Sequence, residues 1–150
     1  MARWAPARAD VIGEYADEAL AVFPAGRILI GLDGDDAAAR TGFAADLAAA
    51  VVERGVPAEA AAFRDEAAFR VDLLGPFRAG ALLPGDRAVL VVEGQGLLEP
   101  GVVGIWHLTA WLDSPEAPRV ARRSVPRTRA AVTFDLTDPA HPRRVFADAC

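Results

Sequence analysis

The chain has 150 residues, 53% of them hydrophobic and 25% charged, which excludes a disordered protein and fits one compact domain. Sixteen basic residues against 21 acidic ones give a net charge of −5, which argues against nucleic acid as a main partner because phosphate binding needs a basic surface. The single cysteine, Cys150, excludes an intramolecular disulfide and any zinc site built from a cysteine cluster.

The expected elements alternate between helices and short apolar strands. In chain order they are helix 7–22, strand 27–32, loop 33–41, helix 42–55, weak strand 57–63, helix 65–74, strand 87–92, strand 105–112, helix 114–124 and strand 130–134. Apolar runs bounded by glycine are typical of strands that are buried on both faces. This order predicts one α/β domain over residues 1–150, with an N-terminal helix and lead-in over 1–26 and the core over 27–150.

The loop after the first strand is the first place to look for a ligand. Ligands of open parallel sheets bind beyond the carboxyl ends of the strands. Residues 34–41 read GDDAAART, close to the phosphate-loop pattern G-x-x-x-x-G-K-[ST], in which backbone N–H groups surround the phosphates. Gly34 and Thr41 match this pattern, whereas Ala39 replaces its second glycine. Arg40 replaces its lysine, and the chain contains no lysine at all.

Four stretches of the chain, in the same order, resemble the uridine kinase-like P-loop kinases. Residues 26–44 read GRILIGLDGDDAAARTGFA, where members of that family read like G-I-D-G-x-D-G-A-G-K-T. The later stretches are VVEGQGLL at 91–98, WLDSPE at 111–116 with Arg119, Arg122 and Arg123 after it, and DLTDPAHPR at 135–143. The resemblance covers most of the chain. It implies a P-loop NTPase-like three-layer α/β/α sandwich with a mostly parallel sheet of about five strands.

The resemblance also implies a nucleotide site with ATP and Mg²⁺ as cofactors. The residues that it places in nucleotide binding are Gly34, Asp36, Ala38, Ala39, Arg40, Thr41, Arg119 and Arg123. The hydroxyl of Thr41 would coordinate Mg²⁺. Glu93 follows a buried strand and could hold metal or accept a proton, and Asp65 lies near the place of the family's catalytic acid. Glu93 and Asp65 are therefore the candidate catalytic residues.

Each of these residues also has a plain structural interpretation. Thr41 could cap a backbone N–H group at a helix start, and Arg40 could be a surface residue or hold a single phosphate. Glu93 could bond to nearby backbone, and Asp65 could complement the dipole of the helix that it precedes. Asp33, at the junction of strand and loop, is expected to tie down loop backbone.

Departures from the family pattern favour impaired chemistry. In the loop, Ala39 places a Cβ where the backbone should approach phosphate, and Arg40 replaces an ammonium group by a planar guanidinium. Two segments are also short: the one before Asp65 has no room for the family's acid-bearing insertion, and the lid after Arg123 is shortened. We therefore expect weak binding of a nucleotide or small phosphorylated molecule, with phosphoryl transfer lost or impaired. One alternative is an active phosphotransferase that uses Arg40 in the lysine role and Glu93 or Asp65 as base. Another is a scaffold or repurposed enzyme, including a homodimer.

The sequence gives no sign of a membrane or export segment. Its apolar runs are shorter than the ~20 residues that span a bilayer. Residues 1–10 lack the apolar stretch of a signal peptide. We therefore expect a cytoplasmic protein that does not associate with membranes.

Overall fold

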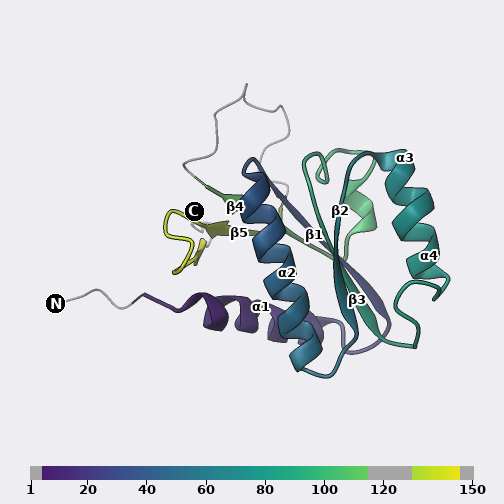
Figure 1. The fold of residues 1–150 in the computed structure, drawn as a ribbon, viewed down its shortest axis with the longest axis horizontal. Helices are drawn as coiled ribbons and strands as arrows, with labels where there is room; N and C mark the ends of the chain where they lie inside the picture. The colour runs from purple at the N-terminus through teal and green to yellow at the C-terminus, as the bar shows by residue number, and fades with distance from the viewer. Residues whose placement is uncertain (1–4, 115–129, 146–150) are drawn as a thin grey trace.

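A computed structural model describes residues 5–114 and 130–145, which form a six-stranded sheet flanked by helices (Figure 1). The strands are β1 (Arg27–Gly34), β2 (Ala58–Ala62), β3 (Ala88–Glu93), β4 (Leu108–Asp113), β5 (Val132–Asp135) and β6 (Arg143–Val145). Their order is β2-β3-β1-β4-β5-β6, and every neighbouring pair is parallel except β5–β6. The expected five strands are thus joined by a short antiparallel sixth strand at the edge.

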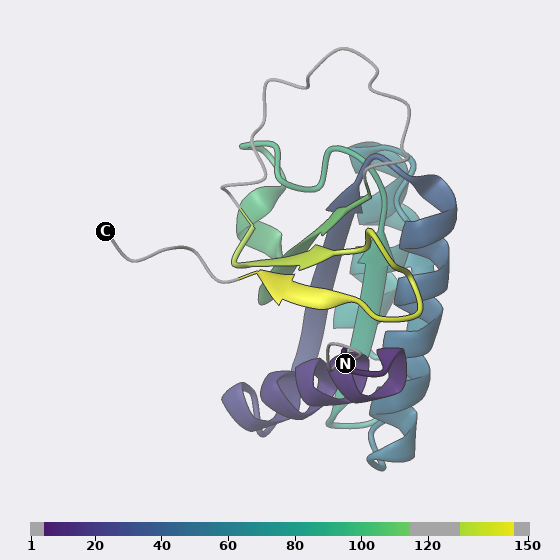
Figure 2. The ribbon, with the colours of Figure 1, turned by 90° about the vertical axis from the view of Figure 1, so that its left-hand side faces the viewer.

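Helices cover both faces of this sheet and give it three layers. The helical segments are α1 (Arg8–Val22), α2 (Ala37–Glu53), α3 (Glu66–Ala68), the π-helical turn η1 (Phe69–Leu74), α4 (Gly75–Arg78) and the 3₁₀ turn η2 (Val103–Ile105). Figure 1 shows α1 and α2 on one side of the strands and α3 and α4 on the other, and Figure 2 shows α1 crossing the direction of β1. Among the described residues, no helix has the length and apolar character needed to span a bilayer.

Two hydrophobic cores follow from the alternation of side chains along the central strands. Ile28 and Ile30 of β1 point into the core that α1 and α2 cover. Leu29 points into the opposite core, where it meets Phe69 and Phe77. Because successive side chains of a strand face opposite sides, one continuous apolar run supplies both cores. The predicted α/β/α sandwich is therefore confirmed.

The entry to β4 packs closely on β1. A Cβ added to Gly31 would lie 2.8 Å from the Trp106 indole, so only glycine leaves room for this ring. The indole Nε1–H of Trp106 donates to the carbonyl of Leu97 over 2.9 Å. Next to it, Nδ1 of His107 accepts the backbone N–H of Leu29 over 2.9 Å. The His107 ring thereby takes the place of a backbone acceptor beside β1.

Two helix boundaries differ from the expected ones. Helix α2 begins at Ala37 rather than at residue 42, because Asp36 caps it and three alanines follow, the residue type with the highest helix propensity. The helix expected over 65–74 continues past Gly75 to Arg78, since proline is tolerated in a first helical turn and Pro76 occupies such a position in α4. Nearly all of the helix expected over 114–124 lies outside the described residues.

Candidate functional site

The predicted loop residues gather at the carboxyl edge of the sheet. Strand β1 ends at Gly34 and α2 begins at Ala37, so only two residues connect them. Glu93 is the last residue of the neighbouring strand β3, where it lies in register with Leu32 of β1. The prediction of a loop up to Thr41 is therefore wrong, because the second half of GDDAAART is the first turn of a helix.

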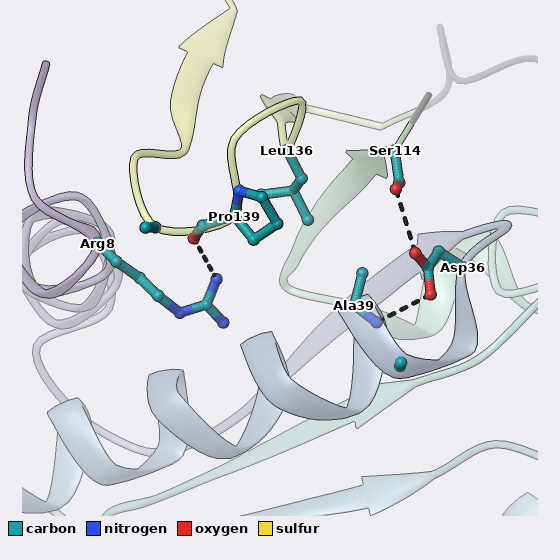
Figure 3. A pocket seen from close by; sticks show the side chains of 8 residues that line it. Arg8, Asp36, Ala39, Ser114, Leu136 and Pro139 are labelled. Carbon is teal, nitrogen blue, oxygen red and sulfur yellow. Dashed lines mark hydrogen bonds between the residues drawn. The ribbon is translucent and has the colours of Figure 1, made fainter. Parts of the chain in front are cut away.

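Asp36 closes the N-terminal end of α2. Its Oδ1 accepts the backbone N–H of Ala39 over 3.1 Å, and its Oδ2 accepts the hydroxyl of Ser114 over 3.1 Å (Figure 3). A helix N-terminus attracts anions because its first N–H groups have no partner within the helix. In this protein a carboxylate of the chain itself takes that place, and Ser114 fixes its orientation.

Arg40 points inward from α2 toward the end of β3. Phe43 and Leu47 mark the buried side of α2, and Arg40 lies on that side one turn earlier. Its Nε donates to Oε2 of Glu93 over 2.9 Å, and its Nη1 donates to the carbonyl of Gly34 over 2.7 Å. The two charged side chains are only 12% and 11% exposed. Arg40 and Glu93, both predicted site residues, thus form a largely buried ion pair.

Thr41 lies on the opposite side of α2 and is exposed, as is Ala45 one turn later. Within the described parts of the chain, no group of three or more His, Cys, Asp or Glu side chains is placed to hold a metal ion. Mg²⁺ in phosphate-binding sites is commonly held by one or two protein groups together with the substrate's phosphates. Thr41, the hydroxyl that the sequence proposes for Mg²⁺, lies on the other side of α2 from Arg40 and Glu93.

Asp33 holds the neighbouring loop in place. Its side chain is on the face opposite to Glu93, is 2% exposed, and accepts at least three backbone N–H groups. Oδ1 accepts from Gly34 over 2.7 Å, and Oδ2 accepts from Gly96 and Leu97 over 3.2 Å each. This carboxylate ties the turn after β3 to the end of β1, which is the backbone role expected from its position.

A pocket of about 480 Å³ opens beside the start of α2. Sites for small molecules typically enclose roughly 300–1,000 Å³. Its walls come from four parts of the chain, as Figure 3 shows: Arg8 of α1; Asp36, Ala38 and Ala39 at the start of α2; Ser114 after β4; and Leu136, Pro139 and Ala140 after β5. The guanidinium of Arg8 donates to the carbonyl of Pro139 and to Asp46 of α2, which fixes that wall of the pocket.

The other predicted site residues are Asp65, Arg119 and Arg123. Asp65 caps α3, where its Oδ1 accepts the backbone N–H of Ala68 over 2.8 Å. Arg119 and Arg123 lie outside the described residues, as does Arg122. Arg8 was not predicted, because its contacts with Asp46 and Pro139 join residues 38 and 131 positions apart in the sequence. Ser114 could have been found from its position two residues after the predicted strand 105–112, a signal similar to the one that identified Glu93.

Comparison with known proteins identifies the fold. No family model and no curated protein matches the sequence. A solved structure described as a possible uridine kinase from Bacillus stearothermophilus matches with a TM-score of 0.59 at 18% identity, over 84% of this chain and 98% of that chain. A proposed fructose transport system kinase from a Silicibacter species matches with a TM-score of 0.48 at 21% identity, over 69% of this chain and 75% of that chain. The chain therefore shares its α/β fold with the structure described as a possible uridine kinase.

Proposed function

We propose that this protein binds a nucleotide or a small phosphorylated molecule weakly, and that it has lost efficient phosphoryl transfer. The kinase fold and the pocket beside the start of α2 support the binding part. A nucleotide would place its base or sugar in this pocket and its phosphates toward Arg40. The observation that carries the second part is that Arg40 and the N-terminal end of α2, the two groups that would hold phosphate, already bind carboxylates of this chain.

Phosphoryl transfer depends on positioning and on neutralising the charge of the transferred group. In this chain Arg40 is neutralised by Glu93, and the N-terminal end of α2 is capped by Asp36. The hydroxyl-bearing Thr41 is exposed. Each feature that would pull a phosphate into a reactive position is thus engaged by the chain's own carboxylates or turned toward solvent.

The charge of the sheet edge strengthens this argument. Each parallel strand from β3 to β5 has an acidic residue at or next to its carboxyl end: Glu93 in β3, Asp33 in β1, Asp113 in β4 and Asp135 in β5. Asp113 and Asp135 are register partners. Carboxylates near a polyphosphate repel it, and a divalent cation reduces this repulsion. We therefore expect nucleotide binding to depend on Mg²⁺.

The test combines binding and turnover on the full chain. Thermal unfolding with ATP, ADP, GTP and inorganic phosphate, each with and without Mg²⁺, should show stabilisation, because a ligand of the native state raises stability by mass action. A coupled ATP assay with uridine, cytidine and other hydroxyl acceptors should stay far below the roughly 1–100 s⁻¹ of typical kinases. Turnover in that range would refute the loss of transfer, and absence of any stabilisation would refute the binding.

One observation favours the active enzyme as a second candidate. Arg40 and Glu93, which that reading requires as lysine substitute and base, do lie together at the sheet edge. The active enzyme predicts measurable turnover that Arg40→Ala abolishes together with binding of ATP and Mg²⁺. The homodimer stays a prediction, which a mass measurement in solution would check.

A further inference from the structure

We propose that the Glu93 carboxylate is an internal competitor of phosphate, so that the Arg40–Glu93 pair is an autoinhibitory contact in the anion site. The inference rests on the proposed function, because it concerns regulation of the same site. It goes further in naming what keeps binding weak. A charge-neutral residue at position 93 should then improve phosphate binding rather than impair it.

The geometry of the pair carries the first step. Nε of Arg40 donates to Oε2 of Glu93 over 2.9 Å, while Nη1 is held by the carbonyl of Gly34 over 2.7 Å. The guanidinium fork recognises carboxylate and phosphate oxygens through the same N–H donors. A phosphate that binds bidentately to Nε and Nη2 of Arg40 must therefore take the place of the Glu93 carboxylate on Nε.

Burial and covalent linkage make this competitor effective. Both side chains are nearly nine-tenths buried, so water screens their attraction less than it screens a surface pair. The carboxylate belongs to the same chain, and a tethered partner acts at an effective concentration that reaches the millimolar range. A free phosphate has to compete with it at every encounter, which leaves only weak binding.

The orientation of Glu93 is set by the sheet. Val89 and Val91 of β3 face the α2 side, and Glu93 continues this alternation at the end of the strand. Its carboxylate therefore lies on the face of the sheet that α2 covers, where Arg40 contacts it. Asp33 in β1 faces the other side and binds the backbone of Gly96 and Leu97 instead. Of these two strand-end carboxylates, Glu93 is the one that engages Arg40.

The direct test compares binding of inorganic phosphate and of ATP with Mg²⁺ by calorimetry. The variant Glu93→Gln keeps the shape of the side chain and an oxygen that can accept from Nε, but it removes the negative charge. We expect it to bind both probes at least about tenfold more tightly, a change of roughly 1.4 kcal/mol. Glu53→Gln, at the exposed end of α2, makes the same change in net charge and should leave affinity unchanged. Adding Arg40→Ala to Glu93→Gln should abolish the gain.

A measurement on the unaltered chain covers the case in which Glu93→Gln does not fold. The Nε–H signal of Arg40 in an ¹⁵N spectrum reports its acceptor, and saturation with phosphate should move it. The Nε–H of Arg27, bonded to the carbonyl of Phe77 over 2.7 Å, should stay in place as an internal control. Phosphate that saturates the protein without moving the Arg40 signal would overturn the inference while leaving the proposed function intact.

The remaining outcomes are also decisive. Equal or weaker affinity of folded Glu93→Gln for both probes would show that Glu93 does not compete, and would overturn the inference alone. Binding that appears only in Glu93→Gln would support the inference and would overturn the weak binding proposed for the unaltered chain. Absence of binding in both proteins would overturn the inference and the proposed function together.

Discussion

Replacement of Asp33 by asparagine should destabilise the protein strongly, because the buried carboxylate accepts N–H groups on both of its oxygens. Oδ1 accepts from Gly34, and Oδ2 accepts from Gly96 and Leu97. An asparagine has one acceptor oxygen, so its NH₂ group must face at least one of these donors. Loss of one charge-assisted bond, with a buried N–H left unpaired, costs about 2–4 kcal/mol.

Urea unfolding followed by tryptophan fluorescence measures this loss, and thermal unfolding should show a fall of roughly 5–15 °C for a domain of this size. The matched control is Asp46→Asn, which also removes one carboxylate charge. Asp46 is 55% exposed in its pair with Arg8, so its loss should cost less than about 1 kcal/mol. If Asp33→Asn and Asp46→Asn lowered the unfolding free energy equally, the structural role given to Asp33 would be refuted.

Two further predictions concern the start of β4. Gly31→Ala places a methyl group 2.8 Å from the Trp106 ring and should lower the free energy of unfolding, measured by urea titration, by about 1–3 kcal/mol. Gly104→Ala places its methyl group in open space and should lower it far less. Equal losses in the two variants would contradict the packing argument. Partial desolvation, and secondarily the charge of Arg78, lower the pKa of His107, whose Nδ1 accepts the N–H of Leu29. The neutral ring therefore contributes its full stabilisation at pH values above about 6.5, the pKa of histidine in the unfolded chain. This contribution is lost as the pH falls through the lower pKa of the folded state. The free energy of unfolding should therefore decline between pH 8 and pH 5, and His107→Gln should remove this decline.

The fold could be predicted from apolar runs, because its central strands are buried on both faces. Residues 27–32 and 87–92 form almost continuous apolar stretches, and both are strands in the structure. Strand β6 could not be predicted in this way. Its three residues, Arg143–Val145, alternate between exposed and half-buried positions and include two arginines. It pairs with β5 and is linked to α1 by an ion pair between Arg144 and Glu18, which are tertiary contacts with no local signal.

The candidate site was predictable in its location but not in its contacts. The position of Glu93 at a strand end and of Arg40 after the first strand identified the carboxyl edge as the place to look. That the two side chains bond to each other depends on the phase of α2 and on the face that Glu93 occupies. The face of Glu93 depends on where the alternation of β3 places its last residue. Whether Arg40 lies inside α2 depends on where that helix begins, and sequence patterns locate helix ends only to within a few residues.

The early start of α2 explains two contacts together: the Asp36 cap on the helix and the Arg40–Glu93 ion pair. Where a phosphate loop keeps glycine before its basic residue, the backbone stays free to curve around the ligand. Here alanines at 37–39 favour helix, and Asp36 directly before them caps it, so the helix begins at Ala37. Because the helix begins there, Arg40 lies inside α2 on the same buried side as Phe43, and its guanidinium contacts Glu93. The substitution Ala39→Gly alone would therefore weaken the Asp36 cap and the Arg40–Glu93 contact together, while leaving the Glu93 carboxylate in place as a competitor.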